Sequence, residues 1–296
     1  MPADRLSHVK DEYLPSEKLD LAVEVARAAR RPLLLYGDPG SGKSSLARYV
    51  ASRDSLRYYD HVVTSRTTAR DLLWTFDSVR RLGEAQVSGA DIEPARYVHP
   101  GALWWAFDRD SAASSANPHE PYAEWNSGRA KAGAVVLIDE VDKADPDVPN
   151  SLLVPLGDRR FDVSDLPVGN REIAEPDSCA SLVVITSNEE RDLPAAFVRR
   201  CVVYRVPPHD RQALRQIAAK RFPGSRFPLD HLTDALLSAR NSAGDDRRRK
   251  PSTAEFLDAV RACVTLGITD TGHPGLGDVV SLAIRKDPGR ENEDGG

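Results

Sequence analysis

Apolar residues recur along this chain in two patterns, short continuous runs and stripes at helical spacing. The runs predict strands buried on both faces, as in a parallel sheet. Strands are expected at residues 33–36, 58–64, 134–138, 182–185 and 202–206. Helical stripes alternate with them, and the first covers residues 17–30, where Ser16 can cap the helix. The alternation predicts an α/β core.

A helix is expected after residue 68, whereas residues 85–131 give no single regular pattern. Thr68–Asp71 is expected to begin a helix whose apolar stripe continues from Leu72 to Val79. The aromatic run at residues 103–107 predicts core packing or, as the alternative, an exposed protein-binding loop. Residues 110–129 are rich in Ser, Ala, Asn and Pro and predict a surface loop.

The strongest local motif follows the first strand. Residues 37–44 fit the pattern G-x-x-x-x-G-K-[ST] between a strand and a helix, which disfavours an incidental glycine-rich turn. Loop amides can approach phosphates closely, Lys43 can reach the β- and γ-phosphates, and the Ser44 hydroxyl can ligate Mg²⁺. The motif predicts a site for a nucleoside triphosphate. The candidate binding residues are Gly37, Asp38, Pro39, Gly40, Ser41, Gly42, Lys43, Ser44 and Ser45.

Polar residues end two further strands. Asp139 and Glu140 follow the strand at residues 134–138, at the end where open α/β sheets bind ligands. Asp139 fits a Mg²⁺-holding role and Glu140 the activation of an attacking water, which favours hydrolysis over transfer. The alternative is an acid pair that caps a helix. Asn188 either holds the lytic water or contacts the γ-phosphate, or it caps the following turn.

A hairpin and an arginine pair complete the α/β part. Residues 160–163 and 171–173 flank a Pro/Gly/Asn turn and predict a β-hairpin. Arg199 and Arg200 follow a short helical turn at residues 195–198. Paired arginines are usually solvated surface charge. Their position soon after Asn188 suggests instead that one of them reaches the nucleotide of a neighbouring subunit.

Composition narrows the class of protein. The 296 residues are 41% hydrophobic and 29% charged, as in an ordinary globular protein with one large or two modest domains. Lys and Arg number 40 against 45 Asp and Glu, and this charge of −5 disfavours a protein that mainly grips a phosphate backbone. Three scattered cysteines disfavour a disulfide framework or a zinc site. No run approaches the ~20 apolar residues of a membrane helix, and we expect a cytoplasmic protein.

In this order the motifs resemble the AAA+ ATPases, and the MoxR-type branch in particular. GDPGSGKSS resembles Walker A, VVLIDEVDKAD Walker B, VVITSN sensor 1 and LPAAFVRRC the arginine-finger segment. The hairpin before sensor 1 and the insertion around GALWWAF are similar to the two extra elements of this branch. The resemblance covers roughly residues 13–284 and rests on the whole set of motifs, since no single one is specific.

The resemblance implies a fold and an activity. We expect a three-layer αβα core with a parallel five-stranded sheet at residues 1–207, a small all-α lid at 208–286, and a disordered polar tail at 287–296. Leucine stripes and the capping box Ser252–Glu255 agree with helices in the lid. ATP and Mg²⁺ are expected between core and lid at the subunit seams of a ring, with a hexamer as the expected size. Arg200, or Arg199 as the second choice, is expected to be the arginine finger.

The expected function is remodelling of a partner complex driven by ATP hydrolysis, with a client or adaptor that carries a von Willebrand A domain. The alternative is a nucleic-acid motor or loader, which shares the ATPase parts but predicts a basic pore surface. A nucleotide switch or kinase-like protein would lack the combination of Glu140, Asn188 and the paired arginines.

Two assignments stay open. The family lid usually opens its third helix with an arginine, sensor 2, that contacts the γ-phosphate. Here Lys250 or Arg249 takes that role, or the role is absent and the segment is a solvated basic loop. Upstream, Tyr13 and Leu14 either cover an adenine ring or staple the first helix to the core.

Overall fold

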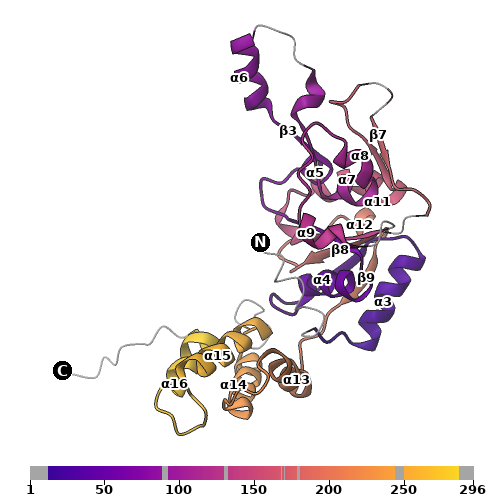
Figure 1. Cartoon of the computed structure of the whole chain (residues 1–296). Helices are drawn as coiled ribbons and strands as arrows, with labels where there is room; N and C mark the ends of the chain where they lie inside the picture. Colours follow the sequence, from indigo (N-terminus) through magenta and orange to yellow (C-terminus); the bar gives the residue numbers. More distant parts are fainter. Residues whose placement is uncertain are drawn as a thin grey trace, which may run out of the picture. The chain divides into compact units, whose positions relative to one another are not determined.

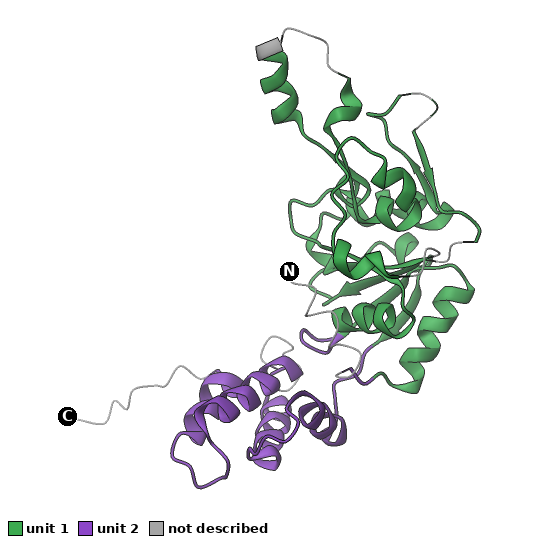
Figure 2. Ribbon diagram, viewed as in Figure 1, with its two compact units in different colours: residues 1–10, 15–36, 43–205 green, residues 11–14, 37–42, 206–296 purple. Residues whose placement is uncertain are grey.

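The structure is a computed structural model that describes residues 13–88, 93–129, 133–167, 169, 171–178, 181–243 and 250–286. The chain divides into two compact units (Figure 2). The first contains residues 1–10, 15–36 and 43–205, and the second contains residues 11–14, 37–42 and 206–296. The predicted tail and Arg249 lie outside the described residues. The predicted domain limits remain predictions.

Five parallel strands form the centre of the first unit, in the order β2-β5-β8-β1-β9. They are β1 (Leu33–Tyr36), β2 (Arg57–Val62), β5 (Ala134–Asp139), β8 (Leu182–Ser187) and β9 (Val202–Arg205). Each lies within two residues of its predicted ends. The parallel arrangement agrees with the apolar runs, because a strand covered on both faces cannot alternate with polar residues. The predicted α/β class is confirmed.

Helices cover both faces of this sheet (Figure 1). Alternate strand residues such as Leu34, Val136 and Ile185 belong to a buried core together with residues of α7, α11 and α12. Successive strand residues point to opposite faces, so Leu35 and Leu137, which are also buried, face away from that core. Helix α3 contacts β1, and α4 contacts β5. The helices are α3 (Glu17–Ala28), α4 (Lys43–Arg53), α7 (Ala102–Phe107), α10 (Asp147–Ser151), α11 (Leu153–Asp158) and α12 (Ala195–Val198).

The predicted helix start at Thr68–Asp71 is confirmed, since Thr68 and Asp71 form a capping box, but a single helix that continues to Val79 is wrong. The chain forms α5 (Ala69–Leu73), then β3 (Trp74–Phe76), then α6 (Ser78–Ser88). Strand β3 pairs antiparallel with β4 (Val98–Pro100), which follows the 3-10 helix η1 (Pro94–Tyr97). Pairing with a distant strand therefore overrides the helical stripe, and Val79, expected on its apolar face, is 84% exposed.

The aromatic run forms α7, in which every residue is buried. Core packing is confirmed, and an exposed binding loop is wrong. The loop predicted at residues 110–129 instead contains α8 (Arg109–Ala113) and α9 (Ala123–Ser127). The buried Asn126 side chain accepts from Tyr58 N at 2.9 Å and donates to Tyr58 O at 3.2 Å. It thereby pairs the amide and carbonyl of Tyr58 on the open edge of β2, a contact that composition does not reveal.

The predicted hairpin is confirmed as β6 (Arg160–Asp162) paired antiparallel with β7 (Glu172–Ala174). It contacts the β3–β4 ribbon through Trp74. The indole stacks on Phe161, with ring centroids 6.1 Å apart, and its N–H donates to Asp165 Oδ2 at 3.0 Å. One side chain thus joins the two antiparallel ribbons of the first unit.

The described elements of the second unit, after residue 206, are helical. They are α13 (Arg211–Arg221), α14 (Leu229–Ser242), α15 (Thr253–Leu266), α16 (Leu276–Val279) and the π-helix η3 (Val280–Arg285). Ser252 and Glu255 form the predicted capping box at the start of α15. In the described parts of the chain, no helix has the length and apolar character to cross a membrane.

Gly101 provides a test of packing between α5 and the start of α7. A Cβ at this position would lie 2.6 Å from the Leu72 carbonyl oxygen, although the backbone φ of −85° suits any residue. We expect Gly101→Ala to destabilise the first unit by about 1–3 kcal/mol and to lower its thermal midpoint, because main chain must move. The matched control is Gly83→Ala in α6, where an added Cβ meets no atom within 4 Å. Equal midpoints for the two variants would contradict this packing.

Candidate active site

Three predicted motifs meet at the carboxyl end of the parallel sheet. Strands β1, β5 and β8 are neighbours, and their ends lead toward Lys43, Asp139 and Asn188. The Lys43 ammonium donates to Asn188 Oδ1 at 2.8 Å, and the Ser44 hydroxyl donates to Asp139 Oδ1 at 2.7 Å. Residues predicted separately for phosphate binding, Mg²⁺ binding and water positioning are therefore linked by direct hydrogen bonds.

Asp139 is held from a second direction by Thr186, which the sequence analysis did not single out. The Thr186 hydroxyl donates to the same Asp139 Oδ1 at 2.6 Å and accepts from Glu140 N at 2.9 Å. Thr186 is 1% exposed. In the sequence it is one more β-branched residue of a strand, so no local signal distinguishes it.

Glu140 turns the chain sharply after β5. Its backbone has φ 60° and ψ 48°, a left-handed conformation that is uncommon for a residue other than glycine. Its carboxylate accepts from Lys143 Nζ at 2.6 Å and from Asn188 Nδ2 at 3.1 Å. The side chain is thus held between a cation and an amide, next to Asp139.

Asp142 joins the turns that follow β5 and β8. Its side chain is buried, and Oδ2 accepts from the amides of Asn188 at 3.1 Å and Glu190 at 2.9 Å. These bonds fix the Asn188 turn relative to the Glu140 turn. Asp142 and Lys143 belong to the quoted VVLIDEVDKAD segment, but no local pattern assigns either of them a position in the site.

The donor set suits Mg²⁺. A hydroxyl and a carboxylate oxygen lie 2.7 Å apart at Ser44 and Asp139, and both groups are only partly buried. Mg²⁺ is a hard cation that prefers oxygen ligands and usually binds through few protein groups while keeping several waters. Ser44 and Asp139, the residues predicted for this role, are therefore the groups that could hold the ion.

In the second unit, the glycine-rich loop has the conformation its sequence requires. Gly40 and Gly42 have φ of 69° and 91°, values that residues other than glycine rarely adopt. A Cβ on Gly40 would lie 2.6 Å from Ser252 Oγ, so the loop packs closely on the start of α15. The Tyr13 ring lies against Gly42. The choice between its adenine-covering and stapling roles stays open.

A cavity of about 320 Å³ in the second unit lies between this loop and the helices. Arg240 donates to Pro251 O and His209 O, each at 2.9 Å, and His209 Nδ1 lies 2.9 Å from Thr253 Oγ1. The residues that line it include Asp38, Pro39, Ser41, His209, Leu237, Arg240, Lys250 and Ser252. His209 and Arg240 are isolated in the sequence and belong to no motif, so sequence reasoning missed them. Lys250 does lie here, although its proposed sensor role is not tested by this position.

The cavity is electrostatically unusual. Burial lowers the pKa of His209, and the positive charge of Arg240 lowers it further, while Asp210 opposes the shift. Burial also lowers the pKa of Arg240, an effect that the carboxylate of Asp38 opposes. His209 is therefore held in its neutral form at lower pH than an exposed histidine.

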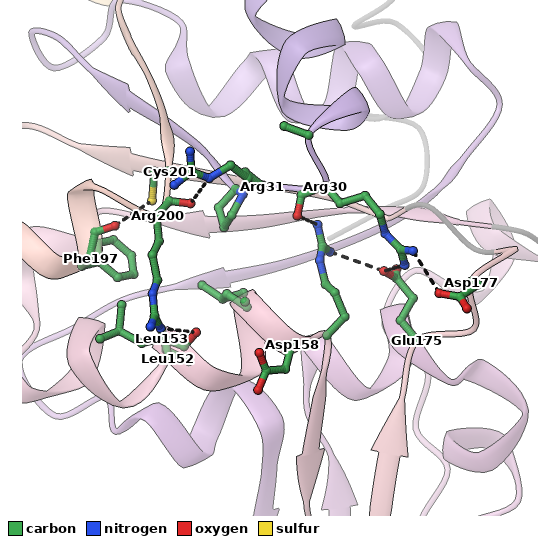
Figure 3. A pocket seen from close by; sticks show the side chains of 15 residues that line it. Arg30, Arg31, Leu152, Leu153, Asp158, Glu175, Asp177, Phe197, Arg200 and Cys201 are labelled. Carbon is green, nitrogen blue, oxygen red and sulfur yellow. Dashed lines mark hydrogen bonds and ion pairs between the residues drawn. The ribbon is translucent and has the colours of Figure 1, made fainter.

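Arg199 and Arg200 lie at the opposite end of the sheet from the Lys43 cluster. They precede β9, whereas Lys43, Asp139 and Asn188 are at the carboxyl ends of strands parallel to it. A four-residue strand spans roughly 13 Å. Both arginines are exposed, and Arg200 borders a cavity of about 640 Å³ that Arg31 and Cys201 also line (Figure 3). The structure does not bring this pair to the other candidate residues of the same chain.

Comparisons with known proteins give a consistent result. A family model described as "AAA domain (dynein-related subfamily)" matches residues 32–201, more than half of the chain. A single-residue variant of RuvB from Thermotoga maritima is similar in structure, with a TM-score of 0.50 at 14% identity over 92% of this chain and 70% of that chain. A second structure, the T. maritima RuvB Holliday junction branch migration motor, gives 0.48 at 13% identity over 93% and 72%. At these identities the likeness to RuvB concerns the fold.

The lowered pKa of His209 gives a pH-dependent test. Unfolded His209 takes up a proton near pH 6.5, whereas the folded residue does so only at lower pH. The unfolded state therefore binds more protons in this window, and stability falls as the pH drops below about 6.5.

We expect His209→Asn to remove this contribution, so the thermal midpoint should fall less between pH 7.5 and 5.5 than in the wild type. His231→Asn, at an exposed position in α14, is the control and should keep the wild-type slope. A steep slope retained by His209→Asn would contradict the assignment.

Proposed function

The chain belongs to the AAA domain family, in its dynein-related subfamily, and we propose that it is an ATPase whose hydrolysis of ATP remodels a partner protein complex. The observation that carries the proposal is the meeting of Lys43, Ser44, Asp139, Glu140 and Asn188 at the carboxyl end of the sheet. These residues come from three separate motifs, and direct hydrogen bonds link the motifs to one another. A set of unrelated surface residues would have no reason to converge in this way.

Each residue has a distinct proposed role. Lys43 and the amides of residues 37–42, followed by Ser44 and Ser45 at the start of α4, bind the phosphates. Ser44 and Asp139 hold Mg²⁺, which when bound supplies positive charge beside the phosphate oxygens.

Glu140 is the proposed general base that takes the proton of the attacking water, and Asn188 orients that water or the γ-phosphate. Lys143 and Asn188 both donate to the Glu140 carboxylate. The hydrogen bond from Lys143 to Glu140 raises the pKa of Lys143. Lys143 therefore keeps its charge beside the base. Asp142 holds the turns that carry Glu140 and Asn188 in register through its two amide contacts.

The proposal of a ring is supported by the position of the arginine pair. Arg199 and Arg200 lie at the amino end of the sheet, away from Lys43 of their own chain, so a nucleotide that they contact would belong to another chain. We place Arg200, with Arg199 as the second choice, at the triphosphate of the neighbouring subunit, where a guanidinium stabilises the charge that develops during phosphoryl transfer. A hexamer, a partner with a von Willebrand A domain and a cytoplasmic location rest on the family resemblance. A nucleic-acid motor is less favoured because the net charge is −5.

Two substitutions separate binding from turnover. Lys43→Ala should weaken ATP binding, because the ammonium interacts with phosphate in the ground state and the transition state alike. Glu140→Gln should retain affinity and lose at least ~10²-fold in turnover, because only proton transfer needs the carboxylate. Fluorescent-nucleotide titration and phosphate release measure the two effects. Glu190→Gln, an exposed carboxylate in the neighbouring turn, is the control and should turn over normally. Brisk hydrolysis by Glu140→Gln would remove Glu140 from the base role.

The arginine assignment is tested by mixing. Arg200→Ala should lose ~10³–10⁵-fold in turnover, and Lys43→Ala should be nearly inactive for want of nucleotide. Some seams of a mixed ring pair the intact Lys43 of one chain with the intact Arg200 of the next, so activity should partly return. Sedimentation with ATP and Mg²⁺ confirms that mixed assemblies form. An inert mixture that does assemble, or a chain that stays monomeric with and without nucleotide, would contradict the assignment of Arg200 to a site between subunits.

A further inference from the structure

Arg31 lies in the short link between α3 and β1, beside the turn that carries Arg199 and Arg200. Both segments lead into neighbouring parallel strands, and Val202 N donates to Pro32 O at 2.8 Å where their pairing begins. Figure 3 shows the Arg31 side chain directed at the main chain of this turn. The link and the turn are therefore adjacent at the amino end of the sheet.

The Arg31 guanidinium donates to two consecutive carbonyls of the turn. Its Nε donates to Arg200 O at 3.1 Å, and Nη2 donates to Arg199 O. The amides of the turn have other partners, each at 3.0 Å: Arg199 N with Ala195 O, Arg200 N with Phe197 O, and Cys201 N with Val198 O. Arg31 thus supplies donors to carbonyls that the helical turn itself leaves without an intrahelical partner.

This pairing fixes the direction of the main chain more firmly than a single bond would. A guanidinium is planar and presents its N–H groups in a rigid fork, so two carbonyls bound to it are oriented together. On the other side, the buried Phe197 anchors the turn, and Cys201 Sγ donates to Phe197 O at 3.4 Å. The turn is therefore held from the core and from Arg31 at once.

The side chain of Arg200 is held much less firmly than its main chain. Nη1 donates to the Leu153 carbonyl at 3.1 Å from an exposed position (Figure 3). A hydrogen bond with an ionised phosphate is stronger than one with a neutral carbonyl, so the guanidinium can exchange partners. A fixed backbone with an exchangeable side chain is what a residue needs if it must reach a group on another molecule.

We infer that Arg31 is a positioning residue for the arginine finger, an inference that rests on the proposed function. It holds the peptide groups of both Arg199 and Arg200, so it serves whichever of the two contacts the neighbouring nucleotide. A displacement of about 1 Å at a reacting group can cost ~10²-fold in rate. Loss of the Arg31 contacts should therefore reduce turnover at the seam without affecting nucleotide binding in the same chain.

Arg31→Met tests this, because it keeps much of the apolar stem and removes every donor. We expect kcat to fall about 10–100-fold, with ATP affinity within about twofold of the wild type. The control is Arg30→Met, whose guanidinium instead contacts Glu175 at 3.5 Å and Asp177 at 3.2 Å. It should keep the wild-type kcat. If Arg31→Met does not fold, as judged by thermal melting, Arg31→Lys keeps the charge without the rigid fork and should show a smaller loss of the same kind.

Mixing separates a positioning role from a general structural one. Arg31→Met with Lys43→Ala should regain activity, because the intact Lys43 of one chain meets the intact Arg31 and Arg200 of the next. The double variant Arg31→Met/Arg200→Ala should be no slower than Arg200→Ala alone, since both changes remove the same contribution. A wild-type kcat in Arg31→Met, or a loss that Lys43→Ala cannot restore, overturns the inference. If Arg200→Ala and Lys43→Ala also fail to complement each other, the seam itself is wrong and the proposed function fails first.

Discussion

One carboxylate oxygen, Asp139 Oδ1, accepts hydrogen bonds from two hydroxyl groups, and the geometry of the candidate site depends on it. Ser44 reaches it from the start of α4 and Thr186 from β8, while Asp139 itself ends β5. Parallel pairing makes the contact possible, because it brings the carboxyl ends of neighbouring strands to the same end of the sheet. Lys43 and Asn188 take their positions from the same helix start and strand end.

The sequence predicts those features of the site that depend on residues close together in the chain. An apolar run followed by a polar residue identifies a strand and its end, so the pattern alone is enough to place Asp139 and Asn188 at strand ends. The glycine pattern before Lys43 and the capping box at Ser252 are also local, because the interacting residues lie within a few positions of one another. Continuous apolar runs also locate the strands, because they suit strands buried on both faces. The five-stranded parallel sheet itself is an expectation from the family resemblance, and it is confirmed.

The rest depends on contacts between distant segments. Thr186 and Asp142 lie in quoted motifs that give them no individual role, and Arg240 lies in none. The importance of all three is visible only once another turn or helix lies against them. Trp74 shows how a local pattern can mislead. Its surroundings have helical spacing, yet antiparallel pairing with β4 makes it a strand residue, because tertiary pairing outweighs modest local propensity.

Trp74 also couples the movements of two parts of the first unit. The β3–β4 ribbon and the β6–β7 hairpin branch from different points of the chain, and the stacking on Phe161 with the bond to Asp165 fastens one to the other. Two separate ribbons would bend independently, whereas this contact couples the bending of one ribbon to that of the other. A displacement of one ribbon at Trp74 therefore has a direct side-chain route to the other ribbon.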